Sequence, residues 1–137
     1  GGGVVQFVAD PREFVAAALS IREEPDPVLP SADAWVEVAA RQVDSETEHG
    51  TTIRTWELTP VESAVVRAQP TTYNRAFGAV VEATVAASRL GTPGFDDDTL
   101  YARLAFFAET VERCGGERER EAMARVDEHT GWRDRSR

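Results

Sequence analysis

The chain has 137 residues, 42% of them hydrophobic, which is enough for one compact domain with its own core and too few for two. Acidic residues outnumber basic ones by 24 to 15, the net charge is -9, and every basic residue is arginine. Because an acidic surface repels phosphate backbones, this composition argues against nucleic-acid binding. The acid excess favours a halophilic protein kept soluble in concentrated salt; the alternative is a GC-rich genome that encodes arginine in place of lysine.

The sequence contains no candidate for a membrane span or a signal peptide. The most apolar stretch, residues 76–87, is too short to cross a bilayer and is interrupted by Glu82. The single cysteine, Cys114, has no partner for an internal disulfide, and we expect it to be a buried packing thiol. These features predict a cytoplasmic protein. Gly1 is not preceded by Met, and a strand-like run follows it almost at once, so we expect a truncated or processed N-terminus.

A strand and a short helix are predicted near the N-terminus. Residues 4–8 are rich in β-branched side chains and predict a buried strand. Asp10 suits the cap of a helix, Pro11 suits its first position, and apolar residues follow at helical spacing as far as Leu19. The segment 23–30 holds three prolines and three acidic residues, and it predicts a loop.

An antiparallel β section follows this loop. Alternating residues predict a strand at 34–43 and a return strand at 53–58, with a polar bend at 44–51 between them. Residues 61–66 predict a third strand or a continuation of the second strand across a bulge, and Pro60 favours a break before them. Trp35 and Trp56 lie on the facing strands, where we expect core or interface packing.

The second half of the chain changes to helical periodicity. One helix is predicted at 74–90, ended by Gly91, and another begins at the capping residue Asp96 and ends at Gly115. Residues 117–129 are mostly charged and predict an exposed helix or a frayed tail. The chain therefore predicts an α+β fold, with residues 1–68 as a β-rich part that includes one short helix. Residues 69–137 form a helical part packed on it, in one domain overall.

The helix at 74–90 carries the residues of greatest chemical interest. Arg75, Glu82 and Arg89 are seven residues apart and share one face, with small side chains between them at Gly78, Ala79 and Ala86. Small side chains let another group approach a helix closely. This pattern predicts a charged stripe that something large is able to contact.

Arg75 stands where the positive end of the helix dipole disfavours a cation. The N–H groups of a helix start, beside Asn74, Thr71 and Thr72, predict an anion site. The alternative is that Arg75 pairs with an acid from a neighbouring strand or subunit and that the small residues only permit tight helix packing, an arrangement commoner than a ligand site.

The other chemically capable residues predict no catalytic group and no metal centre. His49 and His129 are far apart in the sequence and in no metal-like cluster, and we expect both to be solvated. Ser63 and Ser88 lack the context of a nucleophile elbow, and helix capping accounts for the three acids at 96–98.

Two segments resemble a known family. Residues 5–19, a strand and a capped helix, and residues 74–83, read with Ser88 and Arg89, resemble an archaeal family numbered as domain of unknown function 447. The resemblance spans Val4 to about Cys114 and is most specific in the helix that begins at Asn74. The family is placed among the flavin-reductase-like FMN-binding split barrels. The resemblance implies a Greek-key antiparallel β-barrel, partial in this chain, with C-terminal helices, and a homodimer with FMN near the subunit interface.

The chain departs from the family pattern in two places. No segment before Gly1 corresponds to the first strands and the phosphate-binding segment of the family, and Ala86 stands where many members have His. The second departure leaves no acid or base on the helix.

The resemblance gives the leading hypothesis, an FMN-binding, flavin-reductase-like protein, with FMN-dependent oxidoreductase activity as a possibility. The residues expected at or near the cofactor or the dimer interface are Asn74, Arg75, Arg89, Thr71 and Thr72, with Glu82 orienting the arginines. In such proteins the flavin carries the redox chemistry. The alternative is a non-catalytic dimerisation or assembly module that packs through the small-residue face of this helix.

Overall fold

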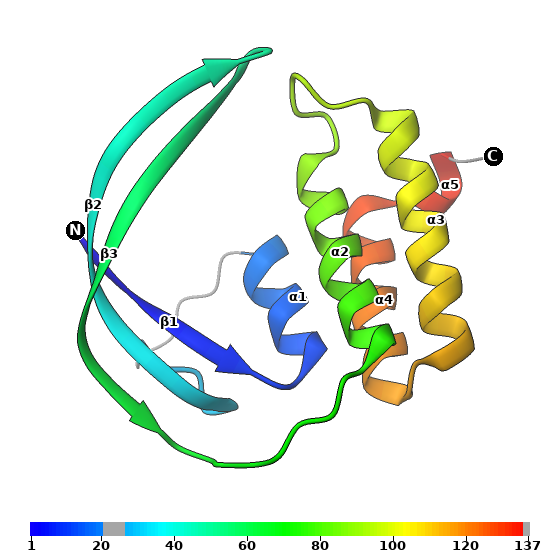
Figure 1. Cartoon of the computed structure of the whole chain (residues 1–137). Coiled ribbons are helices and arrows are strands. Elements are labelled where there is room, and N and C mark those ends of the chain that lie inside the picture. The colour runs from blue at the N-terminus through cyan, green and yellow to red at the C-terminus, as the bar shows by residue number, and fades with distance from the viewer. Residues whose placement is uncertain (21–26, 136–137) are drawn as a thin grey trace. The chain divides into compact units, whose positions relative to one another are not determined.

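The computed structural model describes residues 1–20 and 27–135, which form two compact units, one of strands and one of helices (Figure 1). The sheet unit comprises the described residues of Gly1–Ala9 and Glu23–Pro70, and the helical unit those of Asp10–Arg22 and Thr71–Arg137. This architecture confirms the predicted α+β class. The sequence analysis placed the short N-terminal helix with the strands of residues 1–68. In the structure this helix groups with the later helices.

The sheet unit is a three-stranded antiparallel sheet in the order β1-β2-β3. Its strands are β1 (Gly2–Val8), β2 (Ala32–Glu48) and β3 (Thr51–Val65). β1 confirms the predicted N-terminal strand, whereas β2 and β3 are much longer than predicted. Trp56 on β3 is 50% exposed, so within this unit it is not a core residue.

The bend predicted over residues 44–51 is wrong in extent. Only His49 and Gly50 lie between the strands, because Glu48 is still paired with Thr51. Both turn residues have positive φ, 50° and 82°, which is the backbone of a two-residue hairpin turn whose twist matches that of the strands. The polar residues before the turn stay in the ladder because pairing uses backbone groups and leaves their side chains in solvent.

Pro60 lies inside β3, so the break that it indicated is wrong, and the alternative of a continuation across a bulge is the one the structure shows. Glu37 pairs with Glu62 and Val38 with Pro60, which leaves Val61 as an extra residue in β3. Among the described strands β3 pairs only with β2, and such an edge strand tolerates the missing N–H of proline. A second bulge lies nearer the tip, where Val43 is extra in β2.

The helical unit is built around α2 (Arg75–Arg89), which contacts three other helices. These are α1 (Pro11–Leu19), α3 (Asp97–Cys114) and α4 (Glu117–Thr130), and the short α5 (Trp132–Arg135) follows. The core consists mainly of small and branched apolar side chains, with Leu100, Leu104, Met123 and Trp132 as its larger members. No helix in the described ranges has the length and apolarity needed to cross a membrane.

The helix boundaries follow the capping signals of the sequence. Asp10 accepts a hydrogen bond from the backbone N–H of Arg12 at 2.9 Å, and Asp96 accepts one from that of Thr99 at 3.0 Å. Gly91 follows Leu90, the C-cap residue of α2, and adopts a φ of 71°, a conformation that favours glycine. The predicted starts at Asp10 and Asp96 and the predicted stop at Gly91 are therefore confirmed.

The C-terminal helix α4 belongs to the core, so its interpretation as an exposed helix or frayed tail is wrong. Glu119, Ala122, Met123 and Val126 are buried, and their spacing is that of one helix face. Sequence patterning missed this face because Glu119, one of its four members, is charged. The expectation for Cys114 is also wrong, since its thiol is exposed at the end of α3 and donates to the carbonyl of Thr110 at 3.0 Å.

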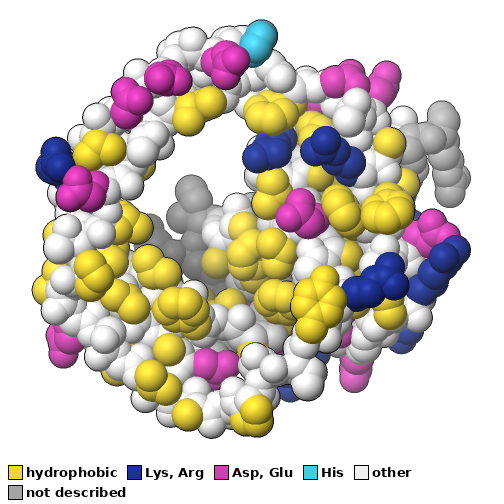
Figure 2. Space-filling view, in the orientation of Figure 1, with side chains coloured by type: hydrophobic (Ala, Val, Ile, Leu, Met, Phe, Trp, Pro, Cys, Tyr) yellow, Lys and Arg dark blue, Asp and Glu magenta, His cyan; other side chains and the backbone are white. Residues whose placement is uncertain are grey.

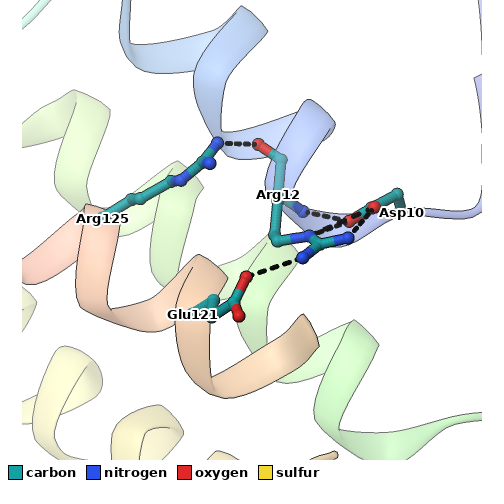
Figure 3. Close-up of polar contacts among 4 residues, drawn as sticks. All are labelled: Asp10, Arg12, Glu121 and Arg125. Carbon is teal, nitrogen blue, oxygen red and sulfur yellow. Dashed lines mark hydrogen bonds and ion pairs between the residues drawn. The ribbon is translucent and has the colours of Figure 1, made fainter. Parts of the chain in front are cut away.

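A polar network joins the start of α1 to α4 (Figure 3). The guanidinium of Arg12 bonds the carboxylate of Asp10 at 2.7 Å and that of Glu121 at 2.6 Å. Arg125 donates to the backbone carbonyl of Arg12 at 3.3 Å. The hydrogen bond from the Arg12 side chain lowers the pKa of Asp10 below its ordinary value.

Candidate functional site

A groove of about 440 Å³ lies on the helical unit between α2 and α3. The two helices come close because α2 buries only small and branched side chains, such as Ala79, Ala83 and Ala86. The walls of the groove are largely aromatic, from Tyr73, Phe77, Phe106 and Phe107. Its polar members include Arg75 and Glu82 on α2.

A smaller depression of about 140 Å³ adjoins this groove. It shares Glu82 and Phe107 with the groove and adds Arg89 from α2 and Arg103 from α3. On the face of the helical unit in view, arginine side chains lie among apolar ones (Figure 2). Together the groove and the depression form one surface that is aromatic at one end and cationic at the other, which we call the α2–α3 face.

The charged side chains of the α2–α3 face are not neutralised by one another. Within residues 1–20 and 27–135, Arg75, Glu82 and Arg103 form no hydrogen bond or ion pair through their side chains. The guanidinium of Arg89 lies 5.0 Å from the ring centroid of Phe95, a cation–π contact. In a chain with 24 acidic residues, arginines that line one surface without a carboxylate partner leave that surface able to bind an anion.

Glu82 lies between Arg75 and Arg89 and bonds neither of them. Seven residues of helix separate it from each arginine, roughly 10 Å along the axis, which is too far for an ion pair. Arg75 also pairs with no acid in the described part of the chain, so the alternative of a pair with a neighbouring strand is wrong, and a pair with another subunit stays a prediction. Glu82 therefore contributes a carboxylate to the α2–α3 face without holding either arginine by direct contact.

Asn74 caps α2 and ties it to α4. Its Oδ1 accepts hydrogen bonds from the backbone N–H groups of Ala76 at 3.0 Å and Phe77 at 3.1 Å. Its Nδ2 donates to Oε1 of the buried Glu119 at 3.1 Å. Two of the N–H groups expected to be open to an anion at this helix start are thus already bonded, and the arginine side chains supply the positive charge of the site.

The predicted site residues are brought together only in part. Arg75 and Glu82 line the groove, and Glu82 and Arg89 line the depression. Thr71 and Thr72 are exposed in the segment before α2 and line neither.

Sequence reasoning missed Arg103 and the aromatic walls. One signal was available in Phe106, which is 62% exposed on α3 beside the partly buried Phe107. A large apolar residue next to the core stripe of a helix indicates a surface that contacts something.

The α2–α3 face suits a flat anionic ligand. Aromatic side chains stack on planar rings, and guanidinium groups bind phosphate through paired hydrogen bonds. The described residues bring no group of three His, Cys, Asp or Glu side chains together in a way that would hold a metal ion.

The family models and the solved structures that match this chain belong to the same family. A model described as protein of unknown function (DUF447) N-terminal domain matches residues 1–67, and one described as protein of unknown function (DUF447) matches residues 74–128. Among solved structures, the chain is similar to the FMN-bound protein MM1853 from Methanosarcina mazei. The identity is 26% and the TM-score 0.71, over 92% of this chain and 70% of that one. No curated protein matches the chain.

Proposed function

This chain belongs to the DUF447 family, and we propose that, like the Methanosarcina mazei protein, it binds FMN. The observation that carries the proposal is the similarity to that FMN-bound structure over 92% of the chain. The isoalloxazine ring of FMN would supply any redox chemistry, as in a flavin-reductase-like oxidoreductase. The protein's own residues would bind the cofactor and set its surroundings.

The residues of the α2–α3 face fit FMN in size and chemistry. A volume of about 440 Å³ falls in the range of roughly 300–1,000 Å³ typical of small-molecule sites. Phe77, Phe106 and Phe107 offer apolar walls for a flat ring, and the arginines, which pair with no acid among the described residues, offer positive charge for a phosphate.

Each predicted site residue receives a role in this proposal. Arg75 and Arg89 contact the cofactor, and Thr71 and Thr72 reach it from the segment before α2. Asn74 acts through the backbone, because its capping bonds fix the first turn that carries Arg75. Glu82 lies between the arginines and offers an acceptor to the ribityl hydroxyl groups.

The family resemblance also suggests a split-barrel homodimer. Large apolar side chains on the three strands are exposed within the sheet unit, among them Phe7 at 55% and Val61 at 65%. Further strands or a second copy of the chain would cover such side chains and the unpaired strand edges.

A second candidate function is a non-catalytic dimerisation or assembly module. The favouring observation is the exposure of aromatic side chains at the groove, where Tyr73 is 90% exposed and Phe106 is 62% exposed. Exposed aromatic residues are common at the centres of protein–protein interfaces. On this alternative Arg75 contacts a partner chain instead of a cofactor.

An FMN titration of the purified chain in concentrated salt tests the proposal, with flavin fluorescence and sedimentation followed together. We expect saturable quenching, weakened by Arg75→Ala and unchanged by Arg113→Ala, an exposed arginine of α3 outside the α2–α3 face. Absence of quenching on a folded chain contradicts the proposal. A dimer that dissociates on Arg75→Ala without any flavin binding favours the assembly module.

A further inference from the structure

Of the residues that the structure describes, Glu119 on α4 is the one that is both charged and buried, with 8% of its surface exposed. A carboxylate is costly to bury unless its oxygen atoms have hydrogen-bond partners. Glu119 has such partners, and they lie at the ends of two other helices. The position of these partners, at one end of the groove, gives the carboxylate a role beyond its own helix.

The two carboxylate oxygens of Glu119 bond to the two helices that form the groove. Oε1 accepts from Nδ2 of Asn74, the cap of α2, at 3.1 Å. Oε2 accepts from the backbone N–H of Gly116, two residues after the end of α3, at 2.9 Å. The start of α2 and the second half of α3 supply most of the groove lining. One carboxylate therefore fixes the spacing of both walls at this end of the groove.

The carboxylate also fixes the orientation of the Asn74 amide. Oδ1 of Asn74 accepts from the backbone N–H groups of Ala76 at 3.0 Å and Phe77 at 3.1 Å, so Nδ2 points away from them. Because a carboxylate only accepts hydrogen bonds, it selects the amide nitrogen for its own side. The first turn of α2, which places Arg75 and Phe77 in the groove lining, is thus held through Glu119.

The junction between α3 and α4 brings Glu119 close to the end of α3. A Cβ at Gly115 would collide with the carbonyl oxygen of Val111 and would lie 3.2 Å from Cβ of Glu119. The N–H of Gly115 donates to that same carbonyl at 2.7 Å. Only glycine leaves room for so close an approach. The place of Glu119 against α3 is therefore set by the backbone of the junction as well as by its hydrogen bonds.

We propose that Glu119 is a positioning residue of the flavin site, which touches no part of the ligand and holds the two walls of the groove in place for it. The assignment rests on the proposed FMN binding and adds to it a residue of α4, a helix that lines neither hollow of the α2–α3 face. Loss of the carboxylate therefore weakens FMN binding even in a chain that remains folded.

The test measures the dissociation constant of FMN for the full chain and three variants, at a temperature where circular dichroism shows each of them fully folded. We expect Glu119→Ala to weaken binding roughly fivefold or more, as the loss of a hydrogen bond that orients the site does. Glu119→Gln keeps an oxygen acceptor for Asn74 and should weaken binding less. The matched control is Val126→Ala, which removes a buried side chain of the same helix outside both hollows and should stay within about twofold.

Amide hydrogen exchange of the ligand-free chain provides a second readout. The N–H groups of Ala76 and Phe77, which bond to Asn74, should exchange faster in Glu119→Ala than in Val126→Ala, because only the first variant frees the capping amide. This readout follows the start of α2 without any flavin present.

Three outcomes overturn the assignment. Unchanged FMN affinity in a folded Glu119→Ala chain leaves this residue with a structural role alone. Equal weakening by Glu119→Ala and Val126→Ala attributes the effect to a general loosening of the helical unit. Failure of the unaltered chain to bind FMN removes the proposed function itself, a result distinct from the first two.

Discussion

The side-chain amide of Asn74 donates to Oε1 of Glu119 at 3.1 Å, and this bond ties the first turn of α2 to the first turn of α4. The other carboxylate oxygen of Glu119 accepts from the backbone N–H of Gly116 at 2.9 Å. A buried acid thus satisfies polar groups of two helix starts at once.

We predict that Glu119→Ala lowers the free energy of unfolding by about 1–3 kcal/mol, because it leaves two polar partners without an acceptor. Urea unfolding followed by circular dichroism measures the change. Glu128→Ala, at an exposed position of the same helix, serves as the control and should stay within about 0.5 kcal/mol of the unaltered chain. Additive losses in Glu119→Ala and Asn74→Ala would contradict a shared bond, since contacting residues show coupling in a double-mutant cycle.

The Asp10–Arg12 pair predicts a specific pH dependence. The Arg12 side chain holds the pKa of Asp10 below its ordinary value of 3.8, so the ionised carboxylate favours the folded state. Asp10→Asn keeps a helix cap but removes the ion pair. The stability difference between the two proteins should therefore be constant near neutral pH and shrink as pH falls below 3.8, through the lowered pKa. Unfolding free energies measured at several pH values test this; a difference that persists in strong acid would contradict it.

Gly78 is expected to lower the stability of α2 and to keep the groove open for a ligand. It lies within α2, where glycine costs about 0.5–1 kcal/mol relative to alanine, and an added Cβ would meet no atom within 4 Å. Gly78→Ala should stabilise the ligand-free chain by about that amount and weaken FMN binding, because the methyl group occupies the groove. Ala105→Gly, at an exposed position of α3, measures the free-energy difference between alanine and glycine in a helix of this protein. It should leave the FMN titration unchanged. Unaltered flavin affinity in Gly78→Ala would count against a ligand in the groove.

The hairpin tip offers a test of the sheet unit. Gly50 has a φ of 82°, where a side chain costs about 1–2 kcal/mol, so Gly50→Ala should lower thermal stability clearly. His49, with a φ of 50°, is better replaced by Asn, which tolerates this conformation, and His49→Asn should stabilise by a few tenths of a kcal/mol. Gly3→Ala, where a Cβ meets no atom within 4 Å, is the matched control. Equal stability of the Gly50→Ala and Gly3→Ala proteins would contradict the turn geometry.

Features set by neighbouring residues were predictable from the sequence. Asp10, Asp96 and Gly91 mark helix ends because a cap depends on contacts within one turn of the chain. The burial of α4 was not predictable in this way. Its inward face includes Glu119, whose burial depends on a partner 45 residues away.

The extent of the strands and the composition of the site depended on tertiary pairing. Residues 44–48 are polar and were assigned to a bend, yet backbone pairing with β3 holds them in a strand. Within the site, the seven-residue spacing brought Arg75, Glu82 and Arg89 to one face. Arg103 and Phe106 lie on another helix, and no periodicity within a single helix reveals a surface shared by two.

The two bulges of the hairpin shift the pairing of β2 and β3 in opposite directions. Val61 adds one residue to β3 and Val43 adds one to β2, so the two shifts cancel, and the pairing at the tip stays in phase with that at the far end. Each valine lies outside the pairs that flank it, so deletion of either one alone would close its bulge and keep the pairs on both sides. Deletion of a paired residue in either strand would instead shift the pairing by one residue and invert which side chains face each side of the sheet, so the two bulges are the places where the hairpin is able to lose a residue.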